Sequence, residues 1–202
     1  MATPAARPAT SDPFKHDRYL VRRKVMALFA PQFHVYDEAD NMIAYVKQKA
    51  FKLKEDIRVY TDETMASELL LIQARQILDF SAAYDVIETK SGQKVGALKR
   101  KGWKSILKDE WILMDAGDHE IGLIQEDSAL LATLRRFLTN LIPQSFMYQV
   151  HGRPVGTLKQ AFNPFVFKGR VDFSADPGGQ VLDRRLALGS VVLLLAIEGR
   201  QG

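Results

Sequence analysis

The chain has 202 residues and no cysteine, which excludes disulfide bonds, thiol catalysis and thiolate metal sites. Hydrophobic residues make up 47% of it and charged residues 26%, the ordinary range of a globular protein. The formal net charge of +4 indicates a mild preference for anionic surfaces, either lipid headgroups or nucleic acid.

The N-terminal stretch, Met1 to Pro13, is rich in alanine, proline and threonine and has no apolar run of the kind that secretory signals carry. We therefore expect residues 1–16 to form a disordered tail. Without a signal of this kind, the default expectation for the location is the cytoplasm.

From Arg18 onward the sequence alternates between short β-rich runs and turns. The first predicted strands are Tyr19–Met26, Gln32–Tyr36 and Met42–Lys47. The polar turn at residues 37–41 joins the second and third of these strands into a hairpin.

The end of that hairpin is then repeated along the chain. The first three intervals between repeats are 26 residues and the last is 34, which suggests an array of one unit made of two strands and a turn. The repeated segments are Ile43–Lys47, Leu69–Gln73, Val95–Lys99, Ile121–Gln125 and Val155–Lys159.

Strand alternation predicts that the small residues Ala44, Gly96, Gly122 and Gly156 lie on the apolar face of these strands. A small residue on that face permits the close approach of another backbone, and a central helix is the natural candidate. The alternative is that these are ordinary glycines at strand bends.

The longer last interval contains residues 128–142, where leucine and phenylalanine recur with the period of an amphipathic helix that Pro143 would end. Such a helix could bind a membrane surface or a partner, or it could plug one end of its own domain. Three more strands are predicted after it, at residues 144–150, 154–160 and 165–173.

The segment Leu186–Ile197 has no charged residue and is apolar on every side when it is wound as a helix, so it must be buried. At about 1.5 Å per residue it is roughly 18 Å long, well short of the ~30 Å hydrocarbon core of a bilayer. Burial inside the protein is therefore the better interpretation.

Together these patterns predict an all-β fold with a central α-helix. About twelve antiparallel strands would form a closed β-barrel wrapped around the hydrophobic C-terminal helix, plus one short amphipathic helix. The barrel domain would span residues 17–198, with residues 199–202 as a C-terminal tail. A closed barrel has no free strand edge, so a monomer is expected.

The order of these motifs resembles the tubby-like superfamily, and within it the LURP-one-related and phospholipid scramblase-like branch. The resemblance is carried by Tyr19–Lys24, Phe33–Asp37, Val155–Gln160 and Val181–Asp183 before the apolar run. It implies a twelve-stranded barrel around a hydrophobic helix, and a non-enzymatic module at the membrane surface.

Two features of the scramblases are missing from the sequence. There is no cysteine-rich palmitoylation segment, and Asp172, Asp176 and Asp183 are too scattered to form the acidic calcium loop. Calcium-triggered lipid scrambling is therefore not expected, although a scramblase-like activity without calcium dependence stays open.

No catalytic motif, metal site or cofactor is predicted. The four histidines, His16, His34, His119 and His151, have no second ligand at metal-binding spacing. The sequence contains no nucleophile elbow, phosphate-binding loop or dinucleotide-binding glycine pattern.

Two basic clusters are the candidate sites for anionic phospholipids. The first surrounds a tryptophan, a residue favoured at membrane interfaces, and the second is interleaved with Phe51 and Leu53. The first consists of Lys99, Arg100, Lys101, Trp103 and Lys104, and the second of Lys47, Lys49, Lys52 and Lys54.

Other interpretations of these clusters remain. They could be solvated loops with Trp103 packed inward, on a structural or adaptor protein with no lipid role that binds a protein partner. Nucleic acid would also fit the basic charge but is the less favoured ligand. The leading expectation is a cytoplasmic, peripheral membrane protein that binds anionic lipid or a protein partner.

Overall fold

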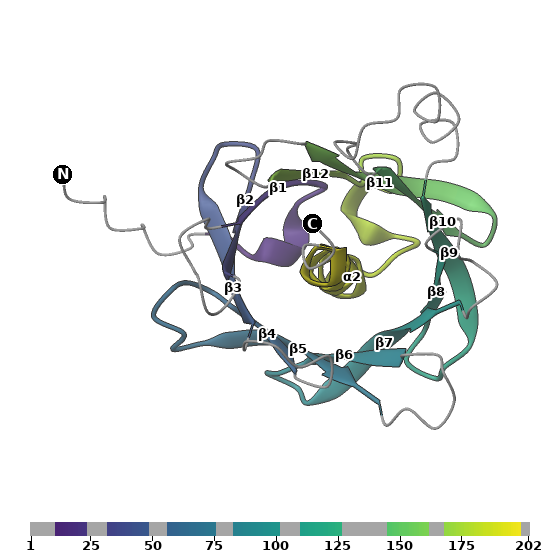
Figure 1. The fold of residues 1–202 in the computed structure, drawn as a ribbon, viewed down its shortest axis with the longest axis horizontal. Coiled ribbons are helices and arrows are strands. Elements are labelled where there is room, and N and C mark those ends of the chain that lie inside the picture. Colours follow the sequence, from purple (N-terminus) through teal and green to yellow (C-terminus); the bar gives the residue numbers. More distant parts are fainter. Residues whose placement is uncertain are drawn as a thin grey trace.

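The computed structural model describes residues 11–23, 32–48, 56–75, 83–101, 110–126, 145–161 and 168–198. Twelve antiparallel strands form a closed barrel, and one long helix, α2 (Arg184–Glu198), lies inside it. Figure 1 looks down the barrel and shows α2 surrounded by the strands. This confirms the predicted fold of a twelve-stranded barrel around a C-terminal helix.

The strands follow one another around the barrel in chain order, and a short 3₁₀ helix lies at each end of the strand series. The 3₁₀ helices are η1 (Pro13–Lys15) and η3 (Pro177–Gly179). The strands are β1 (Arg18–Arg23), β2 (Gln32–Tyr36), β3 (Met42–Gln48), β4 (Ile57–Tyr60), β5 (Glu68–Ala74), β6 (Ala83–Glu88), β7 (Gln93–Arg100), β8 (Glu110–Met114), β9 (Glu120–Glu126), β10 (Ser145–Val150), β11 (Arg153–Ala161) and β12 (Lys168–Asp172).

Pairing between the first and last strands closes the barrel. β1 and β12 run antiparallel, with Arg18 opposite Asp172 and Arg22 opposite Lys168. Every strand therefore has a partner on both sides, and the barrel presents no free edge.

Helix α2 supplies the centre of the hydrophobic core. Its residues from Leu186 to Ala196 are buried, and they pack with the inward-facing side chains of the strands. Ser190, its one polar residue in that run, donates a hydrogen bond of 2.7 Å to the carbonyl oxygen of Ala187 and lies 3.2 Å from the Tyr148 hydroxyl. None of the described helices is both long and apolar enough to traverse a bilayer.

The sequence repeat corresponds to a β-bulge at the same place in five hairpins. In β3, β5, β7, β9 and β11 one extra residue interrupts the register with the preceding strand. These extra residues are the first members of the five repeated segments: Ile43, Leu69, Val95, Ile121 and Val155. The repeated unit is thus a bulged hairpin.

The small residues after the bulges have a different main role from the predicted one. A Cβ at Gly96 would come within 2.6 Å of the Met114 carbonyl oxygen, and one at Gly156 within 2.7 Å of the Asp172 carbonyl oxygen. Gly122 is similarly close to the Gln149 carbonyl oxygen. In each case the next strand leaves no room for a Cβ, and at Gly156 the ring of Phe173 is nearer still.

The predicted close approach to the helix occurs at Gly96 alone among these glycines, where a Cβ would also lie 2.7 Å from a methyl group of Leu186. Helix α2 contributes its own small residue to the contact with the wall. A Cβ at Gly189 would lie 2.9 Å from a methyl group of Val86 on β6.

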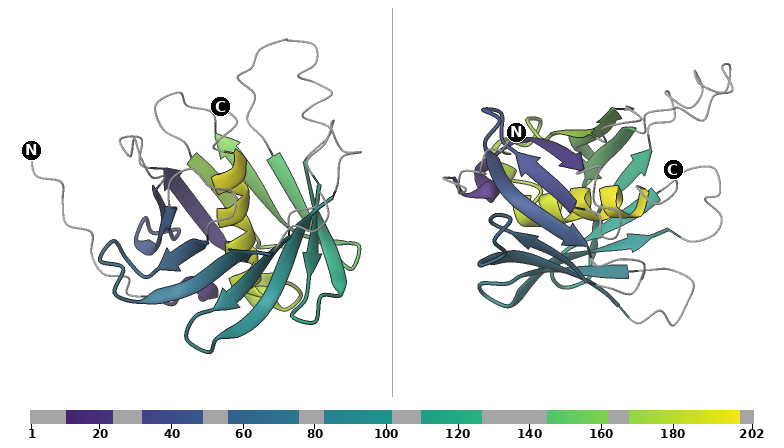
Figure 2. Two further views of the ribbon diagram at one scale, coloured as in Figure 1. Left: turned by 60° about the horizontal axis from the view of Figure 1, so that its bottom comes forward. Right: turned by 60° about the vertical axis from the view of Figure 1, so that its left-hand side comes forward.

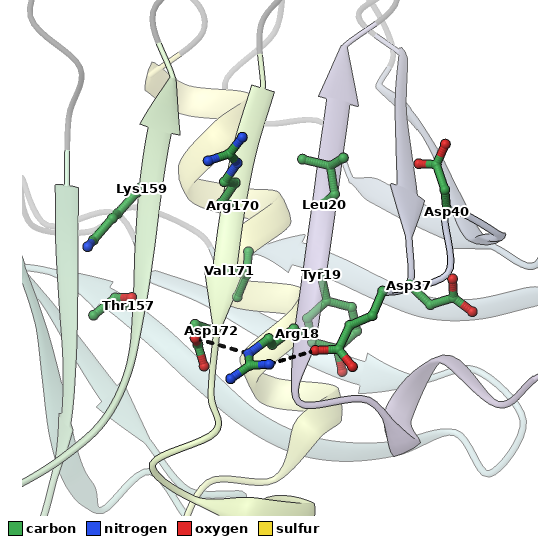
Figure 3. A pocket seen from close by; sticks show the side chains of 11 residues that line it. Arg18, Tyr19, Leu20, Asp37, Asp40, Thr157, Lys159, Arg170, Val171 and Asp172 are labelled. Atoms are coloured by element: carbon green, nitrogen blue, oxygen red, sulfur yellow. Dashed lines mark hydrogen bonds and ion pairs between the residues drawn. The ribbon is translucent and has the colours of Figure 1, made fainter.

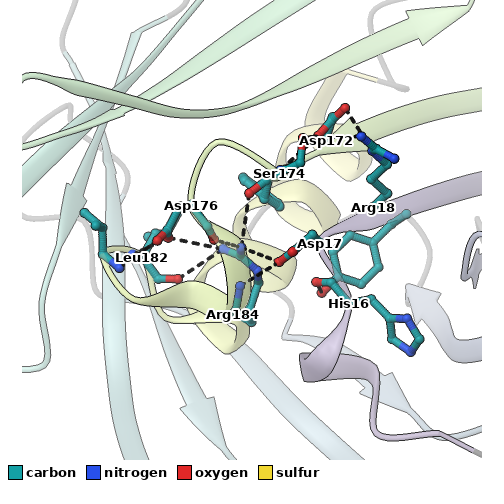
Figure 4. Close-up of polar contacts among 12 residues, drawn as sticks. His16, Asp17, Arg18, Asp172, Ser174, Asp176, Leu182 and Arg184 are labelled. Carbon is teal, nitrogen blue, oxygen red and sulfur yellow. Dashed lines mark hydrogen bonds and ion pairs between the residues drawn. The ribbon is translucent and has the colours of Figure 1, made fainter.

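The start of α2 is fixed by a buried arginine (Figure 4). The Arg184 guanidinium donates to the Asp17 carboxylate at 2.7 Å, to the Phe173 carbonyl oxygen at 3.2 Å and to the Asp176 main-chain carbonyl oxygen. The Asp176 carboxylate in turn accepts the main-chain N–H groups of Val181 at 3.0 Å and Leu182 at 2.9 Å. This network joins β1, β12 and α2 at one end of the barrel.

The predicted amphipathic helix at residues 128–142 lies outside the described residues. So do the first residues of the predicted strand at 165–173, of which β12 is the described part, and the last residues of Tyr19–Met26, of which β1 is the described part. Each of these predictions therefore stands untested beyond the described ranges.

Candidate lipid-binding surface

The strand ends that border undescribed residues all lie at one rim of the barrel. In Figure 2 these strand ends lie at the end of the barrel at which α2 terminates. Basic side chains outnumber acidic ones among the two outermost residues of each strand there. The basic ones, which we call the basic rim, are Arg22, Arg23, Lys47, Arg58, Lys99, Arg100 and Lys168, against Glu110 and Glu126.

Part of this positive charge is balanced by acidic partners. Arg22 pairs with Asp40 at 2.6 Å, and Arg58 pairs with Glu68 at 2.6 Å. The hydrogen bond to Glu68 raises the pKa of Arg58, so the guanidinium keeps its charge in this pair. Three lysines of the rim have no ion pair or side-chain hydrogen bond with a described residue: Lys47, Lys99 and Lys168.

The first predicted cluster is divided by strand alternation at the end of β7. Lys99 lies opposite Ile112 on the outer face, whereas Arg100 lies opposite the buried Trp111 and places its guanidinium 5.9 Å from the centre of that ring. Lys101, just beyond the strand, pairs with Glu110 at 3.0 Å. Lys99 is thus the described member of this cluster that lies outward without an acidic partner.

The remaining members of the two clusters are mostly outside the described residues. This applies to Trp103 and Lys104 of the first cluster, and to Lys49, Lys52 and Lys54 of the second. Lys47 is exposed near the end of β3, directly opposite Gln32 on β2 and Arg58 on β4.

A second basic feature, which we did not predict from the sequence, lies on the outer wall between β11 and β12. Lys159 and Arg170 are directly opposite one another in the register of these strands, and both are exposed. The alternation of the last repeat indicated that Lys159 is outward. Nothing in the sequence indicated that Arg170 would be the neighbour of Lys159, because the sequence does not reveal the register between β11 and β12.

The other titratable groups do not assemble into a metal site within the described ranges. His, Asp and Glu form no group of three or more there that could hold an ion. His34 pairs with Glu63 at 2.6 Å, and His119 pairs with Asp115 at 3.1 Å.

Comparisons with known proteins identify the fold. No protein-family model matches the chain. A search of curated proteins also gives no match. Among solved structures, the crystal structure of an Arabidopsis thaliana protein matches with a TM-score of 0.51 and 12% sequence identity, over 95% of this chain and 99% of that one. At this identity, the match shows that the two chains share a fold over almost their whole lengths.

Proposed function

We propose that this protein is a non-enzymatic module of the LURP-one-related branch of the tubby-like superfamily, which binds anionic lipid at a membrane surface through the basic rim. Lys47 and Lys99, which lie outward and have no acidic partner among the described residues, carry the proposal. A lysine within reach of anionic headgroups adds roughly 1 kcal/mol to membrane binding.

The sequences that follow these strand ends support the same orientation. Lys99 precedes Gly102-Trp103-Lys104, and Lys47 precedes Lys49, Phe51 and Lys52. Lysine beside aromatic residues is the composition that favours the interface between headgroups and acyl chains. The strands of this rim thus carry positive charge, and the sequence that follows β3 and β7 is rich in aromatic and basic residues.

The experiment is flotation of the full chain with vesicles. Neutral phosphatidylcholine vesicles would be compared with vesicles that contain about a quarter phosphatidylserine, at low and at physiological salt. Selective binding to the anionic vesicles that weakens with salt is expected, because the Debye length falls to about 8 Å at physiological ionic strength. Equal flotation with both kinds of vesicle, or none, would contradict the proposal.

A charge-reversed variant localises the binding. Lys47→Glu with Lys99→Glu is expected to abolish the anionic selectivity. The matched control is Lys90→Glu with Arg153→Glu, which makes the same change of charge at exposed positions of the opposite end, in the β6–β7 turn and at the start of β11. If the control lost binding to the same extent, net charge alone would explain the effect, and the rim would not be the binding surface.

The predicted residues Trp103 and Lys104 need their own test. Replacing both by serine in the full chain is expected to weaken vesicle binding while the unfolding midpoint stays unchanged. Unchanged vesicle binding would remove these two residues from the proposed surface and leave the lysines of the strands.

A further inference from the structure

A groove of about 480 Å³ runs along the outer wall of the barrel, next to Arg22 and Lys168 of the basic rim. Figure 3 shows that its sides come from β11 and β12 on one hand and from β1 and the β2–β3 turn on the other. We call it the β11–β12 groove. It is lined by Arg18, Tyr19, Leu20, Asp37, Glu38, Asp40, Thr157, Lys159, Arg170, Val171 and Asp172.

The acidic side chains of the groove are already occupied. Arg18 pairs with Glu38 at 3.0 Å and with Asp172 at 3.1 Å, and Asp40 pairs with Arg22. Hydrogen bonds from Ser174, and then from Arg18, hold the pKa of Asp172 below its usual range, so this carboxyl is ionised in its pair.

Asp37 is also satisfied within the protein. Its carboxylate accepts the main-chain N–H groups of Ala39 at 2.9 Å and Asn41 at 2.8 Å, which close the β2–β3 turn. The negative charges on this side of the groove are therefore committed to the fold.

The positive charges of Lys159 and Arg170 are not neutralised by any acidic partner among the described residues. They stand directly opposite one another on β11 and β12, and both are exposed. Within the described ranges neither has an ion pair or a side-chain hydrogen bond. Two like charges directly opposite across a sheet are destabilising, so an anion held between them would offset a cost that the fold otherwise bears.

The surroundings restrict the kind of anion. An arginine fork beside a lysine suits the oxygens of a phosphoryl group. Leu20, directly opposite Arg170 on β1, gives an apolar surface next to the charge. A continuous polyanion such as nucleic acid would also pass over the carboxylates of the β2–β3 turn on the facing side, whereas a single phosphoryl group, esterified through oxygen to an organic molecule, fits between Lys159 and Arg170 alone.

We propose that Lys159 and Arg170 bind the phosphoryl group of a phosphate ester in the β11–β12 groove. The ester is either a membrane lipid headgroup or a soluble molecule, because both present the same tetrahedral oxyanion. The site does not include Lys47 or Lys99, the two lysines that carry the proposal for the basic rim.

The test measures binding of glycerol 3-phosphate to the full chain by two-dimensional NMR, with flotation on phosphatidylcholine vesicles that contain phosphatidic acid as a second arm. The ester should perturb the amides of Thr157–Gln160 and Gly169–Asp172. Lys159→Ala with Arg170→Ala should weaken binding about tenfold or more, the usual effect of removing charge-assisted hydrogen bonds. Lys90→Ala with Arg153→Ala removes the same charge elsewhere and should leave binding unchanged.

The two arms distinguish the source of the ester. Loss of vesicle binding alone would assign the groove to a lipid headgroup, and loss of glycerol 3-phosphate binding alone to a soluble ester. Absence of binding in both arms, equal losses in the control variant, or preferential binding of single-stranded DNA through the same pair would overturn the proposal. The rim variant Lys47→Glu with Lys99→Glu should retain glycerol 3-phosphate binding, so the two proposals can fail separately.

Discussion

Glycine is required after the bulges by the carbonyl oxygens of the next strand. We expect Gly122→Ala to lower the free energy of unfolding by about 3 kcal/mol, because the new methyl group would overlap the Gln149 carbonyl oxygen and the two strands would have to separate. The matched control is Gly117→Ala, whose methyl group would meet the movable ring of His119 at 3.0 Å and should cost about 0.5 kcal/mol or less. Urea denaturation measures both, and equal midpoints would contradict this explanation.

Asp176 is a buried charge that holds two main-chain N–H groups and faces a buried arginine. We expect Asp176→Ala to cost about 3–5 kcal/mol, because it leaves Arg184 and the N–H groups of Val181 and Leu182 without this partner. The comparison is Asp40→Asn, in an exposed pair with Arg22, which should cost less than about 1 kcal/mol. Thermal unfolding would show the difference.

Asp17 makes stability depend on acid pH. The hydrogen bond from Arg184 holds the pKa of Asp17 below the value of about 3.9 that an unfolded chain has. Because the folded pKa is the lower one, the stabilisation is complete above the unfolded pKa and is lost as the pH falls through the folded value. Asp17→Asn keeps an acceptor oxygen but does not titrate.

The free energy of unfolding of Asp17→Asn should therefore fall less steeply than that of the wild type below about pH 4. Urea titrations between about pH 2 and pH 6 would measure the slopes. Parallel slopes for the two proteins would show that Asp17 does not contribute to acid sensitivity.

At the scale of the element, α2 has the character of a core and not of a surface helix. We expect Leu194→Asp to unfold the protein, because Leu194 is fully buried and an unpaired carboxylate there costs as much as the 5–15 kcal/mol by which domains are usually stable. Val181→Asp, at an exposed position just before the helix, should leave the protein folded. Circular dichroism and size-exclusion chromatography would distinguish the two outcomes, and a folded Leu194→Asp protein would contradict the central position of α2.

Helices and strands could be predicted from the sequence where a single pattern, such as an apolar run or strand alternation, determined them. The apolar run of α2, the strands with regular alternation and the 26-residue repeat were visible because burial and bulge geometry constrain nearby residues in the sequence. Arg184 and Arg185 show the limit. They are adjacent and chemically identical, yet Arg184 is buried against Asp17 and Asp176, while Arg185 is partly exposed and pairs with Asp183 and Glu88. Two of these partners, Asp17 and Glu88, come from distant segments, so the local sequence gives no sign of them.

At the scale of the whole molecule, the candidate binding surfaces depend on closure of the barrel. The sequence indicated Lys47 and Lys99 as basic residues, but not that their strand ends share one rim with Lys168. The pair Lys159 and Arg170 depends on the register of β11 with β12, which is set by long-range pairing. Spacing along the chain could therefore predict basic clusters but not the groove.

Removal of the helix tests the same closure. A chain that ends at Asp183 keeps all twelve strands but exposes their inner faces, so we expect it to lose cooperative unfolding and to bind a hydrophobic dye such as ANS. A chain that ends at Glu198 retains α2 and should unfold like the full chain. Cooperative unfolding of the shorter chain would show that the strands suffice to form the barrel.

The position of α2 also determines when the protein can fold during its synthesis. All twelve strands precede the helix in the chain, so the ribosome makes the wall of the barrel before the segment that fills it. At about 5–20 residues per second, a stretch of 202 residues takes roughly 10–40 s to synthesise. Until α2 has been made, the inner faces of the strands lack their cover, and a nascent chain of this kind should depend on chaperones until α2 emerges.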